Sequence, residues 1–215
     1  MREFLDYLWF RRGHIVDLAV EHAQLVLYAV GIATVISVAI GVLVYRRERL
    51  SAIAIAVTGT LFTIPSLALF SLMIPIIGLG FRPALAALVI YSMLPIMRNT
   101  IAGLRSVDPA VVESAQGMGM NRLRRLVRIE FPLAWPVILT GIRVSTILTV
   151  GIAAIAAYIN GPGLGEDIFA GLSRIGTPTA LHLILGGILG VVVLALLFDA
   201  MFLVVGRLTT SRGIR

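Results

Sequence analysis

Long apolar runs constrain the fold of this chain more than any other feature of its sequence. A transmembrane helix needs about 20 mostly apolar residues, and the sequence contains five runs of about that length or longer. They cover about residues 23–44, 52–77, 84–103, 137–158 and 181–206. Because lipid offers no water to backbone groups, runs this long are expected to cross as helices. We therefore predict an all-α integral membrane protein of about five transmembrane helices, forming a single domain over residues 1–215.

The composition excludes several other classes of protein. Hydrophobic residues make up 59% of the chain and charged residues 13%, against about 45–50% and about 25% in a soluble domain. The absence of Cys rules out a disulfide scaffold, thiol catalysis and Cys-based metal sites. His14, His22 and His182 fall in no metal-ligand spacing, so no metal site is predicted.

The placement of the arginines predicts the orientation. With the N-terminus outside and the C-terminus inside, twelve arginines face the cytoplasm and five face outward, and Arg143 lies within the fourth run. The cytoplasmic set is Arg46, Arg47, Arg49, Arg98, Arg105, Arg122, Arg124, Arg125, Arg128, Arg207, Arg212 and Arg215. Cytoplasmic loops carry the excess of basic residues, so this orientation is favoured over its inverse. The net charge of +7 then reflects topology and contact with lipid headgroups, and no nucleic-acid partner is expected.

Residues 1–22 carry too many charges for the apolar core of a cleavable signal peptide. Their apolar and aromatic residues instead predict a helix at the outer membrane surface. It would serve either as a surface anchor or as a docking element for a partner.

The stretch 104–136 is the longest predicted cytoplasmic loop. Asp108-Pro109 is a helix start, and Gly117 and Gly119 predict the end of that helix. A second, basic helix is expected over 121–130, with the prolines at 132 and 136 marking the start of the fourth span. Small residues on the first helix favour close docking of another protein. The four arginines between residues 122 and 128 equally favour anionic lipid headgroups, so the residues alone leave both interpretations open.

This loop resembles the EAA motif of ATP-binding-cassette importer permeases. The motif reads Glu-Ala-Ala, three residues, Gly, nine residues, then Ile-x-Leu-Pro. The matching positions are Glu113-Ser114-Ala115, Gly119, Ile129 and Phe131-Pro132. The spacing is complete, and the two departures, Ser114 for Ala and Phe131 for Leu, keep small or apolar character.

The resemblance implies a coupling loop that docks on a separate cytoplasmic ATPase dimer. Carried over residue by residue, Glu113 would face a basic group of the ATPase, Ala115 would pack closely and Gly119 would make the turn. ATP and magnesium would be bound by the ATPase, because this chain has no phosphate-binding Gly-Lys-Ser/Thr loop and is expected to be non-catalytic, with no cofactor of its own. The expected partners are that ATPase, a second permease (a self copy or a paralogue) and a separate extracytoplasmic substrate-binding protein.

Further runs at 58–80, 94–109, 132–143 and 159–169 resemble the osmoprotectant branch of these permeases. The resemblance implies a type I importer permease with a methionine-permease-like fold, in a bacterial plasma membrane. It would carry quaternary ammonium solutes such as glycine betaine, choline, carnitine or proline betaine. Alternatives are import of another small solute such as an amino acid, or secondary transport. The latter is disfavoured because the chain has no inverted repeats and no acid at the middle of a span for ion coupling.

Two groups of residues are candidates for the translocation pathway. Thr63, Pro65 and Ser66 predict either a hinge lining the pathway or a kinked packing helix. Gly161, Gly163 and Gly165 belong to a loop that would form an outer gate or a plain re-entrant turn.

Ionisable residues in the spans give one more hypothesis. Such groups usually have partners, so Asp199 is expected to pair with Arg143 or Arg98 and to staple the inner half of the bundle.

Overall fold

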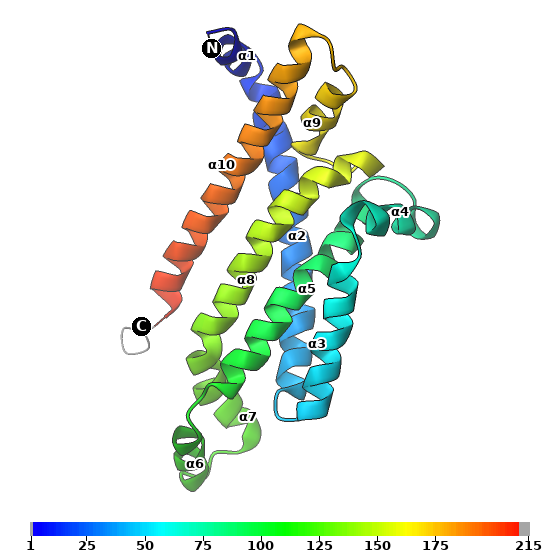
Figure 1. Cartoon of the computed structure of the whole chain (residues 1–215). Helices are drawn as coiled ribbons and strands as arrows, with labels where there is room; N and C mark the ends of the chain where they lie inside the picture. The colour runs from blue at the N-terminus through cyan, green and yellow to red at the C-terminus, as the bar shows by residue number, and fades with distance from the viewer. Residues whose placement is uncertain (1, 211–215) are drawn as a thin grey trace.

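The computed structural model describes residues 2–210, and every regular element within that range is helical (Figure 1). The elements are α1 (Arg2–Phe10), α2 (Arg12–Val44), α3 (Glu48–Thr63), α4 (Ser66–Ile77), α5 (Phe81–Arg105), α6 (Pro109–Gly117), α7 (Arg122–Arg125), a π-helical turn (Leu126–Glu130), α8 (Phe131–Ala153), a 3-10 helix (Ala154–Ile159), α9 (Gly165–Leu172) and α10 (Pro178–Thr209). Of the predicted single domain, residue 1 and residues 211–215 lie outside the described residues, and Arg212 and Arg215 with them.

The number of spans agrees with the prediction of about five. Helices α2, α5 and α10 and the continuous helical stretch Arg122–Ile159 are each long and apolar enough to cross a membrane. The pair α3 and α4 passes the same test only when taken together, which gives four or five crossings. Figure 1 shows α9 and the N-terminus at one end of the bundle and α6 at the other, with α10 ending toward the α6 end.

The predicted second span is not one helix. It breaks after Thr63, and α4 turns away from α3 by 95°. Ile64 and Pro65 both take extended backbone angles. The ring of Pro65 disfavours helical geometry at the residue before it, which is Ile64. The carbonyl of Ile64, left without a helical partner, accepts a hydrogen bond from the hydroxyl of Tyr91 on α5. The expected bend near Pro65 is confirmed in place, but it is close to a right angle.

Two predicted boundaries are wrong. The separate surface helix is shorter than residues 1–22, because α2 begins at Arg12 and α1 ends at Phe10. The loop 104–136 is also shorter than expected, since the helix that contains the fourth span begins at Arg122 rather than near Val137. Pro132 lies in the first turn of α8, directly after the π turn, whereas Pro136 lies inside the helix.

The core is built around α5, which packs along α2 on one side and α8 on the other. Small and hydroxylated residues allow these helices to approach closely, as is common in membranes. At Gly141 of α8, an added Cβ would lie 2.5 Å from the Cβ of Asn99 on α5. Further along the same pair, Ser92 and Thr149 share a hydrogen bond of 2.8 Å, and Ser145 donates to the carbonyl of Ser92. Close packing and interhelical hydrogen bonds therefore hold α5 and α8 together.

A second region of close packing lies at the α9 end. Gly165, the first residue of α9, sits so close to the 3-10 helix that an added Cβ would lie 1.9 Å from the carbonyl oxygen of Ala154. The backbone of both segments would have to shift to admit any side chain there.

We therefore expect Gly165→Ala to lower the free energy of unfolding by about 1–3 kcal/mol, the usual cost of overpacking. The measurement is thermal unfolding of the purified protein in detergent. Gly31→Ala is the matched control, because a Cβ at Gly31 meets nothing within 4 Å. Equal melting temperatures for Gly165→Ala and the wild type would contradict the packing described here.

Candidate functional site

Helix α6 is the central element of the predicted coupling loop, and its two ends are capped as its sequence predicts. At the start, a side-chain oxygen of Asp108 accepts the backbone N–H of Ala110 at 2.8 Å, and Pro109 occupies the first turn. At the end, Met120 donates its N–H to the carbonyl of Ala115, and Gly119 donates to Gln116. This paired arrangement is a Schellman motif.

The glycine at position 119 is required by that motif. Gly119 has a φ of 75°, a left-handed conformation that suits glycine. Gly117, the other predicted breaker, is instead the last residue of α6. The turn is therefore made by Gly119, the position that matches the Gly of the EAA motif.

The motif residues on α6 divide between an outer and an inner face. Glu113 and Ser114 are exposed, whereas Ala115 is 1% exposed. The side chain of Glu113 makes no ion pair or hydrogen bond with any residue between 2 and 210. Large apolar side chains are also exposed on and beside α6: Val111, Met118, Leu123 and Val127. A free carboxylate beside exposed apolar groups is suited to a protein partner.

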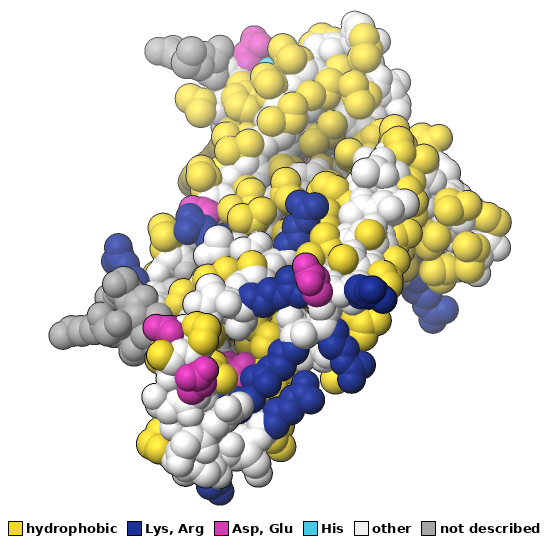
Figure 2. All heavy atoms as spheres, turned by 60° about the horizontal axis from the view of Figure 1, so that its bottom comes forward, with side chains coloured by type: hydrophobic (Ala, Val, Ile, Leu, Met, Phe, Trp, Pro, Cys, Tyr) yellow, Lys and Arg dark blue, Asp and Glu magenta, His cyan; other side chains and the backbone are white. Residues whose placement is uncertain are grey.

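Basic side chains gather around this end of the molecule. Figure 2 shows arginines spread over the face that comes forward when the α6 end is turned toward the viewer. The exposed arginines at this end are Arg46, Arg47, Arg49, Arg98, Arg105, Arg122, Arg124, Arg128 and Arg207. Apolar side chains cover the neighbouring sides (Figure 2). This distribution suits a face that lies next to anionic headgroups.

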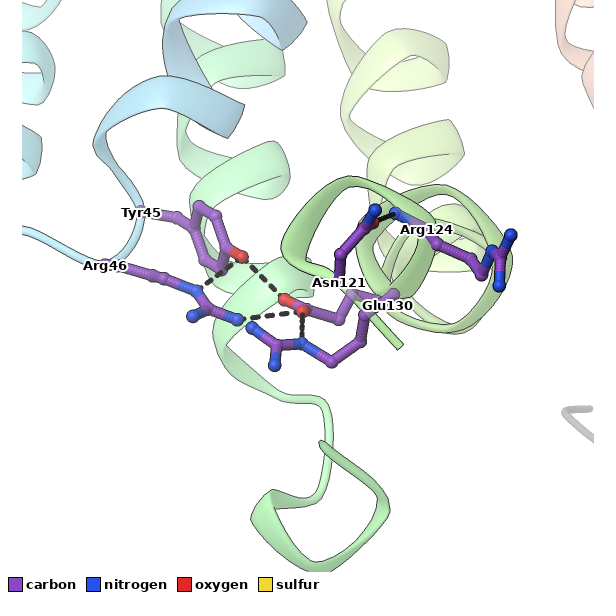
Figure 3. A network of polar contacts seen from close by, with 6 residues as sticks. Tyr45, Arg46, Asn121, Arg124 and Glu130 are labelled. Carbon is purple, nitrogen blue, oxygen red and sulfur yellow. Dashed lines mark hydrogen bonds and ion pairs between the residues drawn. The ribbon is translucent and has the colours of Figure 1, made fainter. Parts of the chain in front are cut away.

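Beside α6 lies a network of polar groups around the buried side chain of Glu130 (Figure 3). The carboxylate of Glu130, which is 1% exposed, accepts hydrogen bonds from Tyr45 Oη at 2.6 Å, Arg46 Nη2 at 2.8 Å and Arg125 Nε at 2.8 Å. Arg46 Nε also donates to the Tyr45 hydroxyl at 2.7 Å. Burial, and then the hydrogen bond to Glu130, raise the pKa of Tyr45, so its hydroxyl remains a proton donor.

Sequence reasoning missed Glu130 as a functional candidate. The sequence feature that could have revealed it is a single acid directly after a segment with four arginines between residues 122 and 128. A lone acid that must enter the apolar bundle needs basic partners. Arg125 of α7 could be predicted as a partner because it is close to Glu130 in the sequence. Tyr45 and Arg46 come from the α2–α3 turn, and only the fold brings them to Glu130.

The remaining coupling residues, Ile129 and Pro132, lie outside α6. Ile129 is in the π turn and is partly buried, and Pro132 is in the first turn of α8. The structure therefore divides the EAA motif between the projecting helix α6 and the base of the fourth span.

The pathway candidates divide into an exposed and a buried group. Thr63 and Pro65 are exposed at the break between α3 and α4, and Ser66 is partly buried there. In contrast, Gly161, Gly163 and Gly165 are buried. Their positions are explained by close packing: a Cβ at Gly163 would meet the Cβ of His22 at 2.8 Å, and one at Gly161 would meet the carbonyl of Ala156 at 2.8 Å.

Two of the three ionisable residues singled out in the spans, Arg143 and Asp199, form a pair. Arg143 Nε and Nη2 donate to the two carboxylate oxygens of Asp199 at 2.7 and 2.8 Å, joining α8 to α10. Arg98 makes no hydrogen bond or ion pair with any described residue. Of the two partners considered for Asp199, the structure selects Arg143. A groove of about 450 Å³ lies beside the pair, between α8 and α10.

The family model for the inner membrane component of binding-protein-dependent transport systems matches residues 33–210. The chain belongs to this family. A choline transport system permease protein of Bacillus subtilis, OpuBB, is 37% identical over 100% of this chain and 97% of its own length. A glycine betaine/carnitine/choline transport system permease protein of the same organism, OpuCB, is 36% identical over the same shares.

A solved structure shares the fold of 94% of the chain. The MetNI methionine transporter in an inward-facing conformation superimposes with a TM-score of 0.80 and 19% identity, covering 94% of this chain and 98% of the matched one. The predicted fold, a type I importer permease of the methionine-permease kind, is thereby confirmed. The chain is an inner membrane component of a transport system.

If the pair between Arg143 and Asp199 fixes α8 against α10, Asp199→Asn will lower the melting temperature of the purified permease and its recovery as an assembled complex. A bidentate ion pair is lost, and Arg143 is left in an apolar setting without its partner. Asp17→Asn on α2 serves as the control, because Asp17 is exposed and unpaired among the described residues. Unchanged stability and assembly of Asp199→Asn would reject a stapling role.

Proposed function

We propose that this chain is the permease subunit of an ATP-driven importer and couples to its ATPase through α6. The observation that carries this proposal is the geometry of the coupling loop. Helix α6 is rigidly capped, stands at the end of the bundle, and presents an exposed, unpaired Glu113 beside exposed apolar side chains. Glu113 would accept a charge-assisted hydrogen bond from a basic residue of the ATPase.

The proposed substrates are quaternary ammonium osmoprotectants: glycine betaine, choline, carnitine or proline betaine. Support comes from full-length relatives at 36–37% identity whose names give choline, carnitine and glycine betaine as their substrates. The methionine transporter supports the fold alone, because its identity to this chain is 19%. Import of an amino acid therefore has no comparable support.

The proposed assembly contains several other subunits. Four or five crossings are few for an enclosed pathway, so a second permease, either a copy or a paralogue, would complete it around a two-fold axis. Two ATPase subunits would bind ATP and magnesium, and a separate binding protein would deliver the substrate. This chain would bind no cofactor and catalyse no reaction itself.

We place the α6 end in the cytoplasm and the α9 end outside. The arginine-rich face of the α6 end supports this orientation. It would put the N-terminus outside, the C-terminus inside, and the break between α3 and α4 in the outer half of the bundle.

The docking role of α6 predicts that Glu113→Lys weakens ATPase binding by roughly ten- to hundredfold, the value of a hydrogen bond to a charged group. The measurement is recovery of the ATPase with the affinity-purified permease over a range of ATPase concentrations. Because Glu113 has no partner within the described chain, the variant should fold normally.

Glu48→Lys is the matched control, since Glu48 is an exposed acid at the α6 end but outside the loop. Equal ATPase recovery by Glu113→Lys and Glu48→Lys would mean that another surface binds the ATPase, and the assignment of α6 would fail.

A further inference from the structure

The chain enters and leaves α6 through one polar cluster, here called the Glu130 network, in which Arg46 and Arg105 are exposed and the other members are buried. Its members come from the α2–α3 turn, the start of α3, the end of α5 and the segment from α7 to the π turn. They are Tyr45, Arg46, Ser51, Arg105, Arg125 and Glu130.

On the incoming side, Arg105 connects α5 to the other helices. It is the last residue of α5 and stands three positions before the capping residue Asp108. Its Nε donates to the backbone carbonyl of Tyr45 at 2.7 Å, and its Nη2 donates to Ser51 Oγ at 2.5 Å. The segment that leads into α6 is thus tied to both the α2–α3 turn and α3.

On the outgoing side, the π turn brings Arg125 and Glu130 together. Residues five apart in an α-helix lie roughly 140° apart around the axis. A π turn closes its hydrogen bonds between residues i and i+5, so residues five apart lie on nearly the same face. The π turn Leu126–Glu130 therefore allows Arg125 Nε to reach Glu130 at 2.8 Å while Glu130 also reaches Tyr45 and Arg46.

Burial makes these contacts hard to exchange for water. Glu130 is 1% exposed and Arg125 is 3% exposed, so removing either partner leaves a buried charge. A network of this kind moves as a unit or switches between discrete arrangements, rather than sliding gradually. A cleft of about 400 Å³ separates it from α6, with Glu113 and Gln116 on the far wall.

We propose that Glu130 is a positioning residue that transmits movement of α6 to the spans. The inference rests on the proposed function, because it assumes an ATPase that moves α6. The network joins both ends of the coupling segment to the α2–α3 turn, α3 and α5, and Glu130 directly precedes α8. Displacement of α6 by the ATPase is then converted into displacement of the bundle. Glu130 contacts neither substrate nor ATPase in this role, and docking does not depend on it.

The experiment measures solute imported per ATP hydrolysed, in proteoliposomes that contain the permease, the ATPase that co-purifies with it and its binding protein. Radiolabelled glycine betaine and choline are the probes. Glu130→Gln should keep ATPase recovery near the wild-type level and lower the import ratio by roughly two- to thirtyfold, the range of coupling effects along packed networks. Tyr45→Phe keeps every charge and removes only hydroxyl contacts, so its ratio should fall at the lower end of that range.

Two matched controls separate this role from a general structural effect. Tyr28 lies on α2, the helix that leads into the turn with Tyr45, and its hydroxyl makes no hydrogen bond among the described residues, so Tyr28→Phe removes a hydroxyl outside the network. Glu48→Gln removes an exposed acid at the same end. Both should import at the wild-type ratio.

The proposal is overturned if Tyr45→Phe, folded and bound to the ATPase, imports at the wild-type ratio. It is equally overturned if Tyr45→Phe folds but loses the ATPase, since the network would then serve docking. If Glu130→Gln folds, its import ratio is a second test of the proposal. If Glu130→Gln does not fold, Tyr45→Phe alone decides. The proposed function fails separately, if the wild-type complex hydrolyses ATP but imports neither glycine betaine nor choline. In that case the role of Glu130 is tested by ATP hydrolysis alone: the same variants are compared for the ratio of hydrolysis with binding protein to hydrolysis without it. An unchanged ratio in Tyr45→Phe would overturn the role of Glu130.

Discussion

A buried carboxylate must be surrounded by donors, and Glu130 imposes this requirement on the whole α6 end of the bundle. Its three donors come from the α2–α3 turn and from α7, so these segments have to meet at the base of α8. Arg105 joins the same network through the carbonyl of Tyr45. The position of α6 relative to the spans follows from these contacts, because both of its flanking segments end in them.

Much of the fold could be predicted because a bilayer leaves few choices for long apolar runs. The third and fifth runs correspond closely to α5 and α10. The errors arose where tertiary contacts override local signals. Pro65 predicted a bend, but neither its 95° angle nor the hydrogen bond from Tyr91 to the carbonyl of Ile64 can be read from the local sequence. Pro132 predicted the start of the fourth span, but the helix of that span already begins before Pro132 and continues through the π turn into α8.

The site shows the same division between local and long-range information. The caps at Asp108 and Gly119 are local interactions, so the sequence alone indicates them. The pair of Arg143 and Asp199 required a choice between two arginines that only packing could make. The glycines of 161–165 predicted an outer gate or a plain re-entrant turn, and the structure adds that they are buried by close approach to His22 and the 3-10 helix, a contact that no local pattern indicates. The Glu130 network combines residues about 85 positions apart, beyond the reach of any local pattern.

The central claim is that this permease moves osmoprotectants only when an ATPase acts on α6. The most direct measurement is uptake of radiolabelled glycine betaine and choline into proteoliposomes that hold the wild-type permease, with ATP, ATPase and binding protein each omitted in turn. The account predicts uptake with all three present and none when any one is missing. Uptake by the permease alone, without ATP, would contradict it and identify a secondary transporter.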